Sequence, residues 1–137
     1  MAQVLMVNAH PLLPEVIEEG RRFVKALCDS GVEVTGAFWL YETERERWRL
    51  MLISPYYDRE EPLAAYSRLG SVFDSMDPPI RFDPTNVSFL RRGDRRLKDL
   101  RRHFKSNTRD SDTVIEGANL GGQYVEAIYL YPPSQKS

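Results

Sequence analysis

The chain has 137 residues, 42% of them hydrophobic and 28% charged, with a formal net charge of −1, which is typical of one folded globular domain and not of a disordered or fibrous chain. Its single cysteine excludes an internal disulfide and favours a reducing compartment. No apolar run approaches the roughly 20 residues that span a bilayer, so we expect one cytoplasmic domain over residues 1–137, with no membrane segment and a frayed tail over 132–137.

The first predicted element is a helix over residues 14–30. Pro14 suits the first helical position, and Gly31 suits the position just beyond the end. The apolar residues fall on one helical stripe: Val16, Ile17, Phe23, Val24, Leu27 and Cys28. We therefore expect Cys28 to point into the core, where a thiol only packs.

Two strands are predicted after this helix. Residues 32–41 alternate between two faces with the period of a strand. Residues 47–56 contain the run Leu50-Met51-Leu52-Ile53, which is apolar on both faces, as in a central strand. The polar link between them lacks Gly and Asn, so we expect a loop of four or five residues there.

The second half alternates helices and strands. We predict a helix over 61–76, ended by Asp77-Pro78-Pro79, then a short strand over 86–91 and a helix over 94–105. Strands over 113–117 and 123–131 follow, joined by a glycine-containing turn. The order α-β-β-α-β-α-β-β has two direct hairpins, which predicts an α+β fold with a mostly antiparallel five-stranded sheet and three helices.

The apolar pattern also predicts the core. The residues expected to be largely buried are Phe23, Leu27, Phe38, Leu50, Leu52, Leu69, Phe73, Leu97, Leu100, Phe104 and Ile128.

Charge is the most uneven feature of the chain. Residues 91–109 hold nine of the nineteen Lys and Arg residues against two acids, a net charge of +7, whereas the other 118 residues have a net charge of −8. On a helix, steps of four and three would stack six cations on one face: Arg91, Arg95, Lys98, Arg102, Lys105 and Arg109. Leu97, Leu100 and Phe104 would fall on the opposite face.

The row of six cations could bind the phosphates of nucleic acid or another anionic partner. Alternatively, it is a solvated face, or it pairs with acids of the same chain.

Aromatic residues near arginines provide a second binding candidate. Trp39, Tyr41 and Trp48 lie close in sequence to Arg45, Arg47 and Arg49. Aromatic rings on a sheet face can stack unpaired bases. The alternative, which we favour, is that these rings pack in the core or pair across strands.

The sequence gives little support for an enzyme. We find no catalytic motif, and neither His10 nor His103 has a second ligand at metal-site spacing, so we expect no catalytic residue, metal or cofactor. The only carboxylate cluster near the basic segment is Asp110, Asp112 and Glu116. It could form the site of a small enzyme, but solvation or salt bridging is the simpler interpretation.

A further alternative is protein–protein interaction, including a homodimer in which the basic helix meets an acidic surface. Two acidic groups could supply that surface: Glu15, Glu18 and Glu19, or Glu42, Glu44 and Glu46. The main hypothesis remains a non-enzymatic module that binds nucleic acid or an acidic protein.

Several short segments carry a resemblance to a known group of proteins. These are Gly36-Ala37-Phe38-Trp39-Leu40-Tyr41, Arg47-Trp48-Arg49-Leu50, Ser54-Pro55, Pro62-Leu63-Ala64-Ala65-Tyr66, and the ending from Tyr124 to Tyr131. Over residues 13 to 131 the chain resembles a family of small uncharacterised bacterial proteins. Because that family has no established activity, the resemblance implies no substrate, cofactor or partner.

Overall fold

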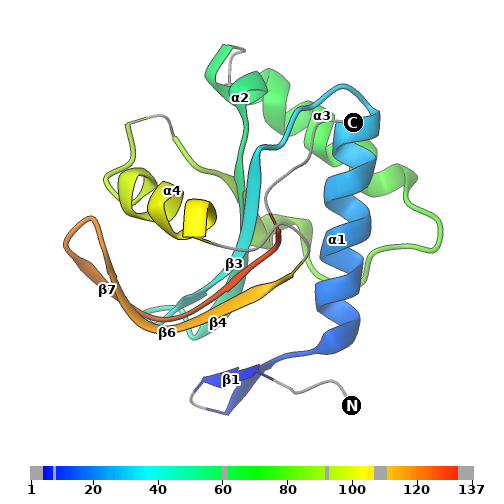
Figure 1. Ribbon diagram of the computed structural model, residues 1–137. Coiled ribbons are helices and arrows are strands. Elements are labelled where there is room, and N and C mark those ends of the chain that lie inside the picture. Colours follow the sequence, from blue (N-terminus) through cyan, green and yellow to red (C-terminus); the bar gives the residue numbers. More distant parts are fainter. Residues whose placement is uncertain (1–4, 8, 60–61, 92, 107–110, 133–137) are drawn as a thin grey trace.

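The computed structural model describes residues 5–7, 9–59, 62–91, 93–106 and 111–132 (Figure 1). The strands are β1 (Leu5–Val7), β2 (His10–Leu12), β3 (Gly36–Glu42), β4 (Arg47–Ile53), β5 (Val87–Phe89), β6 (Thr113–Leu120) and β7 (Gln123–Leu130). The helices are α1 (Pro14–Asp29), α2 (Pro55–Arg59), α3 (Pro62–Ser75) and α4 (Leu97–Ser106), with a 3-10 turn, η1, over Pro84–Asn86. Within the described residues, no helix combines the length and apolar character needed to cross a membrane.

Five strands form the main sheet, in the order β5-β4-β3-β7-β6. All neighbours in it are antiparallel except β4 and β5, which are parallel. The predicted α+β fold and the mostly antiparallel five-stranded sheet are therefore confirmed. The prediction of three helices was incomplete, because α2 forms where the second strand was expected to end.

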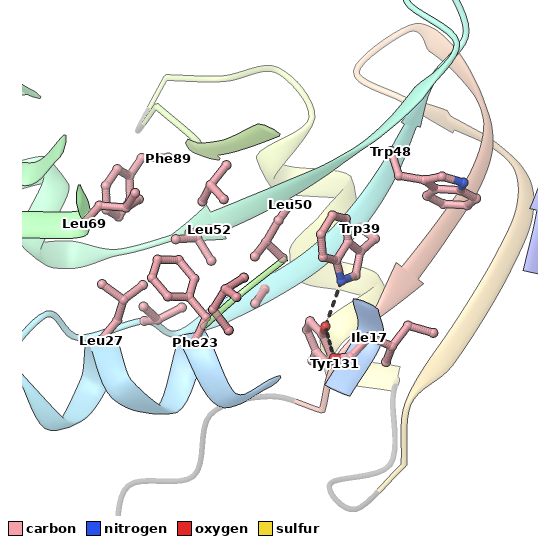
Figure 2. Packing of buried hydrophobic residues seen from close by; sticks show 14 of the residues in the cluster. Ile17, Phe23, Leu27, Trp39, Trp48, Leu50, Leu52, Leu69, Phe89 and Tyr131 are labelled. Atoms are coloured by element: carbon pink, nitrogen blue, oxygen red, sulfur yellow. Dashed lines mark hydrogen bonds between the residues drawn. The ribbon is translucent and has the colours of Figure 1, made fainter. Parts of the chain in front are cut away.

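Helices cover both faces of this sheet (Figure 1). α1 and α3 lie on one face, and α4 lies on the other. Strand β3 is buried on both faces, and its side chains alternate between two core clusters. Ala37 and Trp39 pack toward α1, whereas Phe38 and Leu40 pack toward α4. Figure 2 shows the first cluster, in which Phe23 and Leu27 of α1 lie against the sheet.

Most of the predicted core residues are buried. Nine of the eleven are 7% exposed or less: Phe23, Leu27, Phe38, Leu50, Leu52, Leu69, Leu97, Leu100 and Ile128. Phe73 and Phe104 are only half-buried, and each packs at the margin of a cluster. Cys28 was wrongly placed in the core, because its thiol lies on the exposed side of α1. The buried stripe of that helix is narrower and runs through Ile17, Gly20, Phe23 and Leu27.

Two strand boundaries differ from the prediction for local reasons. The first strand begins at Gly36 and not at 32, since Val32 still bonds through its N–H to the carbonyl of Leu27 as the chain leaves α1. The second strand ends at Ile53 because the buried Ser54 hydroxyl accepts the N–H of Tyr56 at 3.1 Å and caps α2. The small β1–β2 hairpin was not predicted, and its three-residue strands are too short for a periodic signal.

Candidate nucleic-acid interface

Helix α4 is fixed to the sheet by an apolar stripe. Leu97 is 7% exposed and Leu100 is fully buried, and both belong to the cluster built on Phe38 and Leu40. The Phe104 ring meets that of Phe38 edge-on, with 6.4 Å between the ring centres. The opposite face of α4 is therefore turned outward by the packing, as the sequence predicted.

The start of the helix was predicted too early. α4 begins at Leu97 and not at residue 94, because residues 94–96 form a turn closed by the Asp94 carboxylate. This carboxylate accepts the N–H of Arg96 at 2.8 Å and two bonds from its guanidinium, at 3.0 and 2.9 Å. Arg91 and Arg95 thus precede the helix, and the expected six-residue row on one helical face is wrong in that part.

The cations of this segment are nevertheless exposed. We call the exposed set the basic surface; its members are Arg91, Arg95, Lys98, Arg101 and Arg102. The backbone of Lys105 belongs to α4, but its side chain is not among the described parts of the structure. Arg109 lies outside the described residues. Arg101 was missed in the sequence, although its spacing of three from Lys98 and its place away from Leu97 and Leu100 could have revealed it.

The two acids of the segment leave this surface with a net positive charge. Asp94 is bound to Arg96, and this hydrogen bonding keeps the pKa of Asp94 below its usual value despite partial burial. Asp99 accepts the backbone N–H of Gly121 at 2.8 Å. Its distance to the guanidinium of Arg102, 3.9 Å, is the limit of an ion pair, and that side chain is 74% exposed. Among the described residues, no ion pair is formed by Arg91, Arg95, Lys98 or Arg101.

The β6–β7 hairpin holds the start of α4 in place. In Figure 1 the hairpin curls around the side of this helix. The strand alternation breaks at Gly117, whose φ is +71°, so that Leu120 and Val125 both join the cluster under α4. At the tip, a Cβ on Gly121 would lie 2.7 Å from the backbone of Arg95, so only glycine permits this approach. The basic surface is therefore carried on a fixed support.

The aromatic candidates lie in the core, which corrects the stacking hypothesis. Trp39, Tyr41 and Trp48 are 1%, 2% and 8% exposed, respectively, so no ring face is open to a base. The indole N–H of Trp48 donates to the carbonyl of His10 at 3.1 Å, and the ring meets that of Tyr41 edge-on. The interpretation favoured from the sequence, that these three rings pack in the core, is therefore the correct one.

The neighbouring arginines of the β3–β4 hairpin have different environments. Arg47 and Arg49 each bond to a carboxylate oxygen of Glu42, at 3.2 and 3.1 Å. Arg45 lies in the exposed turn.

The carboxylate cluster near the basic segment is used for structure. Asp112 receives two hydrogen bonds from the guanidinium of Arg21, at 3.1 and 2.8 Å, and one from the Tyr129 hydroxyl. Burial raises the pKa of Asp112, but these bonds outweigh it and lower the pKa below the usual value. Glu116 is exposed, and Asp110 lies outside the described residues. Within the described part, no three His, Cys, Asp or Glu side chains are grouped so as to hold a metal ion.

Several acids proposed for a dimer surface have intramolecular partners. Glu19 is buried and bonds to the guanidinium of Arg81 at 2.6 Å. Glu18 bonds to Arg21 at 3.2 Å, and Glu42 is held by the two arginines described above. Glu15, Glu44 and Glu46 are exposed.

Comparison with models of protein families, with curated proteins and with solved structures gives no match. The resemblance to a bacterial family therefore stays a prediction.

Proposed function

We propose that this protein binds nucleic acid through the phosphate backbone, using the basic surface on α4 and the turn before it. The observation that carries the proposal is that α4 and the segment before it hold five exposed cations and only two acids. Of these acids, Asp94 is paired with Arg96, and Asp99 accepts the N–H of Gly121 and lies 3.9 Å from Arg102. Phosphate binding requires positive charge on a rigid face, without any specific side-chain pattern.

The composition of this surface favours phosphates over an acidic protein. Protein–protein interfaces concentrate aromatic and other large apolar residues at their centre. The exposed large apolar side chains of the described part are Met6, Leu13, Leu63, Tyr66, Val114 and Tyr124, and none belongs to α4 or to the turn before it. A surface rich in cations and without large apolar side chains fits a polyanion better than a folded partner.

The test is a charge reversal at two exposed positions of α4. The double variant Lys98→Glu/Arg102→Glu leaves Leu97 and Leu100 in place, so α4 should remain packed. A gel-shift titration against short single- and double-stranded DNA and RNA should show affinity reduced by roughly 10- to 100-fold.

The matched control is Lys25→Glu/Arg68→Glu. It changes the net charge equally at exposed residues of α1 and α3, on the other face of the sheet. This variant should bind nearly as well as the wild type. Equal losses in both variants would mean that only overall charge matters, and no retention of any nucleic acid by wild type at low salt would refute the proposal.

A further inference from the structure

A gap opens in the main sheet beside the basic surface. Strands β3 and β7 pair over only three residues each, Phe38–Leu40 with Ile128–Leu130. Beyond Leu40 and Ile128 the strands diverge, and a cavity of about 370 Å³ lies between residues 40–45 and 123–126. Arg96, which precedes α4, forms part of its wall. We call this cavity the sheet gap.

Two acidic residues would face each other if the strands stayed paired. Continued by two residues, the register would place Glu42 directly opposite Glu126, and like charges at paired positions destabilise a sheet. Glu42 instead turns to Arg47 and Arg49 on the other side of β3. Glu126 accepts a hydrogen bond from the Thr43 hydroxyl at 3.2 Å. The far end of the hairpin is meanwhile held by Asp99, so the gap is built into the fold.

The sheet gap contains side chains that can form hydrogen bonds with a nucleobase, and the basic surface contains cations that can bind phosphate. The wall contains the carboxylates Glu44 and Glu126, the amide Gln123 and the guanidinium Arg45, which together can accept from and donate to the edge of a nucleobase. Carboxylates in the wall disfavour a phosphate there. Tyr124, also part of the wall, is 62% exposed. The hydroxyl end of its ring lies over Gly117 of β6, and the outward part of the ring is open for stacking at the rim of the gap.

The two features are adjacent. Arg96 in the wall follows Arg95 of the basic surface, and Gly121, two residues before Gln123, packs against the backbone of Arg95. A strand whose phosphates follow the basic surface would thus pass the mouth of the gap.

We infer that the sheet gap receives an unpaired nucleobase, with Tyr124 as its stacking partner, so that the ligand of this protein is single-stranded nucleic acid. This inference rests on the proposed function, which supplies the phosphate contacts. A base in a duplex is already paired and stacked and could not enter the gap.

The test compares one labelled RNA in single-stranded form and as a duplex, using fluorescence anisotropy. Wild type should bind the single strand more tightly. Tyr124→Ala should weaken single-strand binding roughly 5- to 100-fold and change duplex binding less than about twofold. Tyr124→Phe is the matched control, because it keeps the ring and should retain wild-type affinity. A circular dichroism spectrum identical to that of wild type would show that the fold is intact.

A second measurement locates the base. Thiouridine placed in the single strand should crosslink, under ultraviolet light, to peptides containing residues 40–45 or 123–126. Crosslinks confined to α4, equal affinity for both RNA forms, or equal losses on both RNA forms in Tyr124→Ala would overturn the inference and leave the proposed function standing. Failure of the wild type to bind either RNA would refute both.

Discussion

The indole N–H of Trp39 donates a hydrogen bond of 2.7 Å to the hydroxyl oxygen of Tyr131, and this hydroxyl in turn donates to the carbonyl of Ile17 at 2.7 Å (Figure 2). Both side chains are buried, so the bonds satisfy polar groups that water does not reach. Through them β3, the end of β7 and α1 are joined at one point. Burial also raises the pKa of Tyr131 above its ordinary value, since the charged form would be poorly solvated there.

Removing this hydroxyl should destabilise the protein. Tyr131→Phe leaves the Trp39 N–H buried without an acceptor, which should lower the free energy of unfolding by about 1–3 kcal/mol. Urea denaturation measures the change. Tyr124→Phe removes the same atom from an exposed ring and should change stability by less than about 0.5 kcal/mol. Equal effects of the two variants would contradict the role of the buried bond.

Two helical glycines should respond oppositely to alanine. A Cβ on Gly20 of α1 would lie 2.3 Å from the Tyr131 hydroxyl oxygen and 3.2 Å from the Trp39 ring, so Gly20→Ala should cost about 1–3 kcal/mol. Gly70 of α3 has no atom within 4 Å of such a Cβ. Gly70→Ala should therefore gain about 0.5–1 kcal/mol from helix propensity alone. Thermal unfolding of both variants checks the prediction, and a stabilised Gly20→Ala would mean that the α1 contact is not as described.

The core on each face of the sheet should respond to truncation. Leu52 is fully buried in the cluster under α1, and Phe38 is 1% exposed in the cluster under α4. Leu52→Ala and Phe38→Ala should each cost about 2–5 kcal/mol. Leu63→Ala, at a residue that is 77% exposed, should cost little. A loss below about 1 kcal/mol at either buried position, measured by denaturant titration, would show that this cluster is not tightly packed.

The Arg21–Asp112 pair should make stability depend on pH in the acid range. Burial opposes ionisation of Asp112, yet Arg21 and Tyr129 outweigh it, and the pKa in the folded state lies below the usual value for Asp of about 3.9. A lowered folded pKa gives stability that is complete above about pH 5 and is lost as the pH falls through 4 and below. Asp112→Asn should therefore cost about 1–2 kcal/mol at pH 7, and the difference from wild type should shrink toward pH 3. A difference independent of pH would contradict the ion pair.

The sequence predicted the elements whose pattern is long and periodic. α1 and the two hairpins of the sheet could be recognised from their periodic apolar residues, whereas the pairing of β3 with β7 was not predicted. The parallel pairing of β5 with β4 could not be recognised, since it depends on how α2, α3 and η1 return the chain to the sheet. The start predicted for α4, residue 94, is three residues early, because the Asp94 carboxylate accepts the backbone N–H of Arg96 and holds residues 94–96 in a turn.

The candidate site also has one part that a local sequence pattern predicts and one part that depends on residues far apart in the chain. Helical spacing predicted the exposed Lys98 and Arg102 of α4 and their separation from the buried leucines of that helix, whereas Arg101 was missed. The sheet gap depends on where β3 and β7 stop pairing, which involves residues more than 80 positions apart. Tyr124 carries no local signal of a role, since one exposed tyrosine at the start of a strand has many explanations.

The most direct test of nucleic-acid binding is the salt dependence of the association constant, measured between 50 and 200 mM salt on one short single-stranded RNA. Release of counterions by the five cations of the basic surface predicts a slope of log K against log salt of about −3 to −4. Lys98→Glu/Arg102→Glu should bind more weakly and with a shallower slope. A wild-type slope near zero, or no binding at 50 mM salt with micromolar protein, would contradict the account.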